Sequence, residues 1–301
     1  MKYNKDVQDA LSWKLFNENK IKNISELKKV KLFNRLICHT KNFFAIAGYG
    51  AFNDGYIIVI TKQLLPSFAL IDRTNEHELI WFVNHLKKAL KSIYKKNTVE
   101  FEHGMCACVG GLDRAHLHLM TLNTNINKKI LESSINKVLE RRRAGIKSIN
   151  FNGTNLINLE DIDSVIKIGN KKDYKINGKQ FKLKDIKNIN TKEWPFGSRK
   201  HVMSGGHYVY FNTELNVSFF TTENFQTQIG REIVFEASIK KDKKLNEIDK
   251  NSKKKNQFSM VWRWQEFIFE ENIKKTIKKT INYFKKSKPD SLSEKYNFQI
   301  L

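Results

Sequence analysis

The sequence predicts an α+β fold: an antiparallel sheet of about five strands, a long helix packed across it and a C-terminal α/β elaboration. Two apolar runs, residues 43–47 and 55–62, are joined by a link rich in Gly, Asn and Asp. Residues 76–94 carry apolar side chains at helical spacing, and residues 114–120 alternate between polar and apolar. These three observations establish the fold class.

The chain has 301 residues, which is enough for one elaborated domain or for two. We expect the first unit to span residues 1–145 and the C-terminal elaboration to span residues 146–301. Residues 126–143, near the end of the first unit, have a helical pattern. Within the second unit, residues 225–239 and 269–284 have helical patterns, and residues 205–211 and 217–220 are typical of a hairpin. Residues 146–199 are polar and rich in Lys, Asn and Gly, with short strand-like pieces that the sequence does not assign further, and residues 240–257 are so charged that we expect a flexible loop.

The alternating segment contains Arg114, His116 and His118 at every second position. In a strand, these side chains share one face, while Ala115, Leu117 and Leu119 point into the core. A guanidinium offers a fixed fork of donors, and an imidazole is a nucleophile or a donor, so this face suits a phosphoryl group. Taken alone, His-x-His more often belongs to a half-buried strand whose polar face meets water.

The order strand, strand, helix, strand, histidine strand resembles the histidine-triad (HIT) superfamily over about residues 32–122. The signatures of that superfamily are His-φ-His-φ-His, with φ apolar, and a preceding strand of the form G-[HY]-φ-φ-φ-φ-x-K. Residues 55–62, GYIIVITK, match the second signature, and residues 114–118, RAHLH, match the first. Gln-x-x-Arg at Gln228 and Arg231, and Trp-x-Trp at residues 262–264, resemble the tails of longer bacterial HIT-domain proteins.

Two registers fit the histidines, because Met120 follows them at one end and Arg114 precedes them at the other. Longer HIT proteins carry Asp-His-Ala-His-Leu-His, with which residues 113–118, DRAHLH, align without a gap. In this second register, the resemblance implies that His116 is the nucleophile and that His118 either holds phosphate oxygens or tunes His116. Arg114 departs from the pattern, either adding charge at the phosphate or marking altered chemistry.

The resemblance implies a nucleotidyl hydrolase or transferase that acts at the α-phosphate through a covalent nucleotidyl-histidine on His116. The predicted catalytic residues are His116, His118 and Arg114, with no cofactor and no metal. The predicted substrate-binding residues are His103, Gly110, Gly111, Gln228 and Arg231. Gly110 and Gly111 equally suit a tight turn without a ligand.

Two alternatives remain open at this stage. Aprataxin-like processing of nucleotide-capped nucleic-acid ends is favoured by the charge, although no zinc finger is recognisable in the sequence. A non-catalytic nucleotide-binding module is favoured by Arg114 and by the lack of a ribose-binding carboxylate near Ala47 and Gly48. Asp54 is close to that position, but Asn53-Asp54-Gly55 is a turn signal.

The net charge is +23, with lysines spread along the chain, so a solvated basic surface and a polyanion-binding role are equally favoured. No apolar run predicts a membrane span, and the first residues lack a signal peptide, so we expect a cytoplasmic protein. The expected partner is a nucleotide or nucleotide conjugate, with nucleic acid and a homodimer left open. The three cysteines do not make a disulfide framework.

Overall fold

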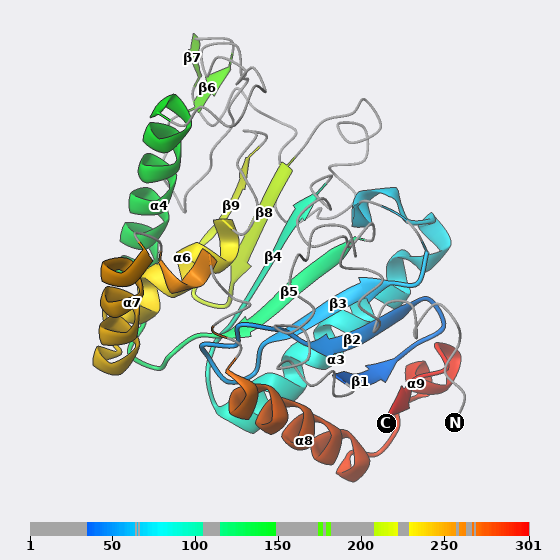
Figure 1. Ribbon diagram of the computed structural model, residues 1–301. Helices are drawn as coiled ribbons and strands as arrows, with labels where there is room; N and C mark the ends of the chain where they lie inside the picture. The colour runs from blue at the N-terminus through cyan, green and yellow to red at the C-terminus, as the bar shows by residue number, and fades with distance from the viewer. Residues whose placement is uncertain are drawn as a thin grey trace, which may run out of the picture.

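The computed structural model describes residues 35–63, 65, 67–104, 115–148, 174–176, 179–181, 208–221, 229–256, 259–262, 267 and 269–300. The described residues form an α+β fold, which confirms the predicted class. Eight strands make one sheet in the order β10-β1-β2-β3-β5-β4-β8-β9, with every neighbouring pair antiparallel (Figure 1).

The sheet is larger than the predicted five strands. Five strands come from the first part of the chain: β1 (Leu36–His39), β2 (Phe43–Ala47), β3 (Ile57–Thr61), β4 (Thr98–Gly104) and β5 (His116–Thr121). Three more come from the C-terminal part: β8 (Tyr208–Thr213), β9 (Ser218–Thr221) and β10 (Gln299–Ile300). The hairpin β8–β9 pairs with β4, and β10 pairs with β1. Both edges of the five-stranded unit are therefore covered, which satisfies backbone groups that would otherwise be unpaired.

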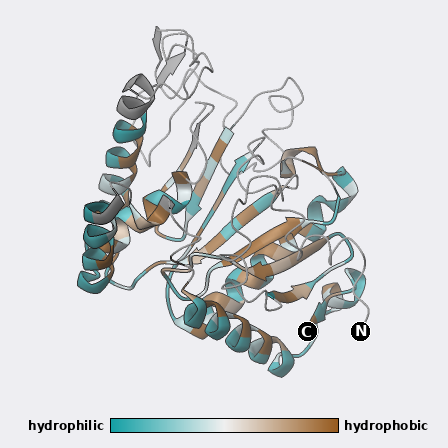
Figure 2. Cartoon of the chain, in the orientation of Figure 1, coloured by the Kyte–Doolittle hydropathy of each residue, from teal (hydrophilic) through white to brown (hydrophobic). Residues whose placement is uncertain are grey.

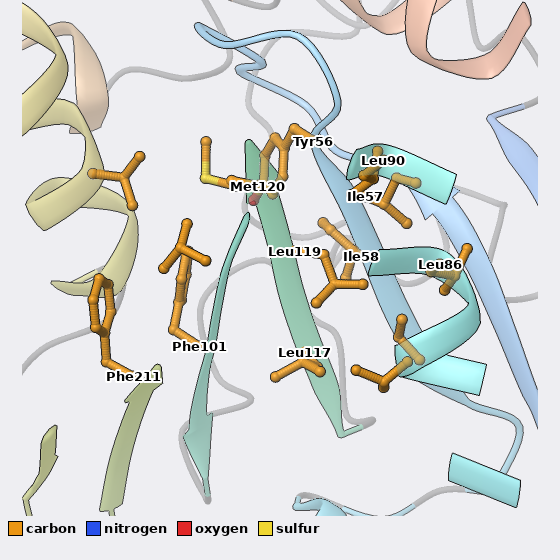
Figure 3. Close-up of a cluster of buried hydrophobic side chains, with 14 of the residues drawn as sticks. Tyr56, Ile57, Ile58, Leu86, Leu90, Phe101, Leu117, Leu119, Met120 and Phe211 are labelled. Carbon is orange, nitrogen blue, oxygen red and sulfur yellow. The ribbon is translucent and has the colours of Figure 1, made fainter. Parts of the chain in front are cut away.

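Helix α3 (Glu76–Tyr94) spans the predicted range and covers one face of the sheet. Its buried residues, Leu79, Phe82, Val83, Leu86 and Leu90 among them, follow the spacing of one helical face. Figure 3 shows Leu117 and Leu119 of β5 directed toward Leu86 and Leu90 of this helix. Two short 3₁₀ turns, Phe68–Leu70 and Arg73–Asn75, precede α3.

Helix α6 (Ile229–Ile239) lies over the opposite face, on the side of Phe101 and Phe211 (Figure 3). A Cβ atom added to Gly230 would lie 2.3 Å from Cδ2 of Phe101. Only glycine therefore allows this close approach of α6 to β4. This packing brings residues near position 230 beside the histidine strand.

Helix α4 (Lys128–Ser148) packs along α6 and corresponds to the predicted helix of residues 126–143. Glu232 of α6 accepts hydrogen bonds from Arg141 and Arg142, each at 2.6 Å. Glu236 of α6 accepts one from Lys137, also at 2.6 Å. Burial would raise the pKa of Glu236, but Lys137 and Arg141 hold it below its ordinary value. Arg141 and Arg142 thus anchor α6 to α4.

The flexible loop expected at residues 240–257 is wrong, because Lys243–Asn256 form helix α7. The many charged side chains of α7 obscure its buried stripe in the sequence. In that stripe, Asp249 and Ser252 are as deeply buried as Leu245. The Asp249 carboxylate accepts hydrogen bonds from Ser259 Oγ at 2.6 Å and from the backbone N–H of Met260 at 3.0 Å. Figure 2 shows α7 as largely hydrophilic, in contrast with the central strands. The turn Met260–Trp262 follows this helix.

The chain ends in α8 (Glu270–Lys286), α9 (Ser291–Lys295) and β10. Helix α8 contacts α3, β1 and β2. The small hairpin β6 (Tyr174–Ile176) and β7 (Lys179–Phe181) falls in the stretch to which the sequence assigned no structure. Among the described helices, none combines the length and the apolar character needed to cross a bilayer.

Candidate functional site

His116 and His118 lie on the face of β5 that α6 covers. Leu117 and Leu119 between and after them are fully buried on the α3 face, as the alternation predicted. His118 is paired in register with Phe101 of β4 and with Ile58 of β3. Because Glu102 is paired with Leu117, the next residue of β4, His103, is adjacent to His116 across the strands. The sheet therefore collects three imidazoles on one face.

The ring of His118 is held between two aromatic rings. The Phe101 ring stacks on it with centroids 4.6 Å apart, and the Tyr56 ring is stacked at 5.8 Å. The Tyr56 hydroxyl and Nδ1 of His118 form a hydrogen bond of 2.7 Å. The ring of His116 meets that of His118 edge-on, with centroids 5.1 Å apart. The orientation of His118 is thus fixed by packing and by one hydrogen bond.

His118 is a neutral imidazole at neutral pH. Burial lowers its pKa well below the ordinary value, and the positive charges of His116, Arg231 and His103 lower it further. A neutral imidazole has one donor and one acceptor nitrogen, and the partner at Nδ1 decides which is which.

Tyr56 is the group that sets this choice. Burial raises the pKa of Tyr56 to about 12, so its hydroxyl keeps its proton, while Arg231 and Arg35 oppose the shift. The two guanidinium groups make the hydroxyl more acidic, which favours donation to Nδ1 of His118. In that arrangement, Nε2 of His118 carries the ring proton and is a donor.

Arg231 enters the site from the first turn of α6. Only 4% of it is exposed, and its two terminal nitrogens donate to the carbonyls of Val261 at 3.0 Å and Gly50 at 2.8 Å. Burial lowers the pKa of its guanidinium, and the Tyr56 hydroxyl opposes that change. The guanidinium of Arg231 is held by backbone carbonyls and acts electrostatically on Tyr56 and His118, and its predicted role in substrate binding stays a prediction.

A second buried guanidinium, that of Arg35, lies just before β1. It donates to the Ala47 carbonyl at 2.8 Å, and its carbon lies 3.6 Å above the centre of the Tyr49 ring. Burial lowers the pKa of Arg35, and Tyr49 and Tyr56 oppose that change. Sequence reasoning did not select Arg35, because its segment carries no recognisable motif.

Four other predicted residues, Arg114, Gly110, Gly111 and Gln228, lie outside the described residues, so their predicted roles stay predictions.

Asp54 precedes a turn at Gly55, whose φ is 75°, and its carboxylate pairs with Lys275 of α8. Cys38 is a free, buried thiol, and Cys106 and Cys108 are outside the described ranges. Within the part of the chain that the structure describes, no three His, Cys, Asp or Glu side chains are placed to hold a metal ion.

Sequence reasoning missed Tyr56 and Phe101 as partners of His118. Tyr56 belongs to the GYIIVITK segment, so its place at the start of a strand paired with the histidine strand was the available signal. Phe101 lies two residues before His103 and therefore on the same face of β4. No protein-family model and no curated protein matches this chain.

Proposed function

We propose that this protein cleaves or transfers a nucleotidyl group at the α-phosphate of a nucleotide-containing substrate, through a covalent intermediate on His116. One observation carries the proposal: the pairing of β4 with β5 places His103, His116 and His118 on the sheet face that α6 covers, and Arg231 of that helix acts electrostatically on His118. A partly buried sheet face that carries imidazoles, a nearby guanidinium and stacked aromatic rings is suited to a phosphoryl group. Such groups stabilise the charge that gathers on phosphate oxygens during transfer.

The proposed reaction has two steps. The lone pair of a neutral His116 nitrogen attacks the α-phosphorus, the bond from phosphorus to the leaving-group oxygen breaks, and that oxygen takes the bonding electrons and a proton. The product of this step is a phosphoramidate on His116. Water or another acceptor then attacks the same phosphorus, gives up a proton and restores the free imidazole.

The difference between the two histidines supports this division of roles. His118 is fixed between Phe101 and Tyr56 and is tethered at Nδ1, which suits a donor whose Nε2 proton is aimed at a phosphate oxygen. His116 is adjacent to that donor, edge-on to its ring, so one phosphate group can reach both imidazoles. Arg231 supplies a fixed positive charge, and we assign the same role to Arg114.

The test is direct detection of the adduct. The purified chain is incubated with a panel of nucleotides and dinucleotides, kept at neutral or alkaline pH because phosphoramidates are acid-labile, and measured as the intact protein by mass spectrometry. We expect a mass increase of one nucleotidyl group that His116→Asn abolishes. His77→Asn, at an exposed position of α3, is the matched control and should keep the adduct.

Other outcomes contradict parts of the proposal. An adduct that persists in His116→Asn and maps to His118 would mean that the first register, with Met120 in the third place, is correct. Nucleotide binding without any adduct or turnover, for every member of the panel, would indicate a non-catalytic binding module instead.

A further inference from the structure

A second positively charged surface lies at the end of α3, away from the histidines. It is an open depression of about 720 Å³ lined only by polar and charged residues: Lys88, Lys91, Ser92, Lys95, Lys96, Asn97 and Thr124. We call it the lysine depression. Thr124 follows the end of β5, whereas His116 begins that strand, so the depression and the histidines lie at opposite ends of β5.

The lysines of the depression carry an excess of charge. Lys91 pairs with Glu214 at 3.0 Å, and Glu214 also accepts a hydrogen bond from the backbone N–H of Thr98. Lys88, Lys95 and Lys96 make no ion pair with any described residue. Three ammonium groups therefore remain available around one concave surface, and Lys279 of α8 adds a fourth charge above the neighbouring Tyr94 ring.

The helix end does not explain this cluster. A lysine in the last turn of a helix interacts favourably with the macrodipole, but the effect falls off within that turn. Lys88 lies two turns before the end, and Lys96 lies beyond it. Lys95 itself ends the helix with φ 53° and ψ 36°, a conformation in which glycine is the usual residue. The chain thus keeps a long cationic side chain where a glycine would be less strained.

The shape and lining of the depression favour an extended polyanion. Lys88, Lys91 and Lys95 follow one another at i, i+3 and i+7, which spreads their charges over about 10 Å along one face of α3. Small-molecule pockets are lined mainly by apolar residues, and membrane-binding helices insert apolar side chains. Every residue that lines this depression is polar or charged, and its apolar surface comes from the carbon atoms of these residues. Lysine, serine, threonine and asparagine are the side chains that contact the phosphates and sugars of nucleic acids.

We propose that the lysine depression binds the phosphodiester backbone of a nucleic acid, without reading its sequence. Lysines act there as point charges on successive phosphates, and Ser92, Asn97 and Thr124 add hydrogen bonds to phosphate or sugar oxygens. The proposal does not depend on the chemistry at His116. It assigns part of the net charge of +23 to a defined surface.

The experiment measures binding of the full chain to a fluorescein-labelled single strand of about 20 nucleotides, and to the matching duplex, by anisotropy between about 50 and 200 mM salt. The test variant is Lys88→Gln/Lys95→Gln/Lys96→Gln. The control variant, Lys243→Gln/Lys244→Gln/Lys250→Gln, removes the same charge from exposed positions of α7. Thermal unfolding and adduct formation are measured for both, and we expect both to match the unmodified chain.

We expect the test variant to bind the single strand at least about tenfold more weakly, with the slope of log K against log salt smaller by about 2, because three phosphate contacts are lost. The control variant should stay within about twofold. Equal weakening of both variants would overturn the proposal, because it would show a diffuse charge effect. Absence of oligonucleotide binding would also overturn it, as would binding only to phosphatidylserine-containing vesicles.

Discussion

The two faces of the central sheet bury polar groups in opposite ways. On the α3 face, Glu100 and Glu102 accept hydrogen bonds from the hydroxyls of Tyr210 and Tyr208. Lys87 of α3 also pairs with Glu100 at 2.9 Å. On the α6 face, His118 is surrounded by groups that are positive when charged. Complementary partners on the first face make a structural network, whereas like charges gathered on the second face favour binding of an anion.

The same contrast appears in the pKa values. Burial and the neighbouring Glu100 raise the pKa of Tyr210, so the phenol keeps the proton that the carboxylate needs. On the α6 face, burial and like charges lower the pKa of His118 and destabilise its charged form. A bound phosphate would favour the charged form of His118 and so oppose the lowering of its pKa. It would have no such role on the α3 face. The comparison predicts that substitutions on the α6 face change activity, while those on the α3 face change stability.

The largest expected effect is on the α6 face. His116→Asn removes the proposed nucleophile, so turnover should fall by at least about 10³-fold with little change in the free energy of unfolding. Steady-state kinetics and urea unfolding measure the two quantities. A variant that unfolds at much lower urea would make His116 part of the core instead and would break the comparison between the faces.

The next effect is on the α3 face. Glu102→Ala leaves the hydroxyl of Tyr208 and the backbone N–H of Phe68 without their carboxylate acceptor in a site that is 1% exposed. We expect the free energy of unfolding to fall by about 3 kcal/mol, the scale of unsatisfied buried donors plus a cavity. The folded fraction should keep kcat within about threefold. A loss below about 1 kcal/mol would show that the network contributes little to stability.

The sequence predicts a helix or strand of this fold when the pattern that indicates it is local. The bounds of α3 and the alternation in β5 follow from the spacing of apolar residues, so they were predicted correctly. The contribution of β8, β9 and β10 to the sheet depends on pairing between distant segments, which no local pattern reports. Helix α7 was missed because its buried stripe combines Leu245 with the polar residues Asp249 and Ser252, so few apolar residues mark it in the sequence.

The residues of the candidate site also divide into those that a local sequence pattern indicates and those whose role depends on the folded chain. His116, His118, His103 and Arg231 were selected from motifs and spacing; the sheet places the three histidines on one face, and Arg231 acts electrostatically on His118. The partner of His118, Tyr56, lies 62 residues away in the sequence, and its role depends on a hydrogen bond that only the folded chain forms. Charge density alone also failed to distinguish Arg141 and Arg142, which anchor α6, from the lysines that line the depression.

A smaller effect tests the role of Tyr56. Tyr56→Phe keeps the ring that stacks on His118 and removes only the hydroxyl that holds Nδ1. Because a single hydrogen bond contributes about 1 kcal/mol, we expect kcat to fall about five- to tenfold while KM stays within about twofold. Tyr94→Phe, a buried phenol beside α8, is the control and should leave kcat unchanged. Equal kcat values for Tyr56→Phe and the unmodified chain would remove Tyr56 from the site.

The smallest effect is the pH dependence of stability. The pKa of His118 is well below its ordinary value in the folded chain, while the unfolded chain titrates at about 6.5. Between these two values, the unfolded state binds a proton that the folded state does not, so the contribution of His118 to stability falls as the pH drops below about 6.5 and is constant above it. His39 and His85, whose pKa values burial also lowers, contribute in the same direction.

His118→Asn should therefore reduce the pH dependence of stability without abolishing it. Between pH 7 and 5.5, we expect the variant to lose about 1 kcal/mol less of its free energy of unfolding than the unmodified chain loses. Urea unfolding at each pH gives the difference, and comparing two pH values cancels any general destabilisation by the substitution. Identical pH slopes for the two chains would mean that His118 is charged in the folded state, and the α6 face would then lose the neutral donor on which the proposed mechanism depends.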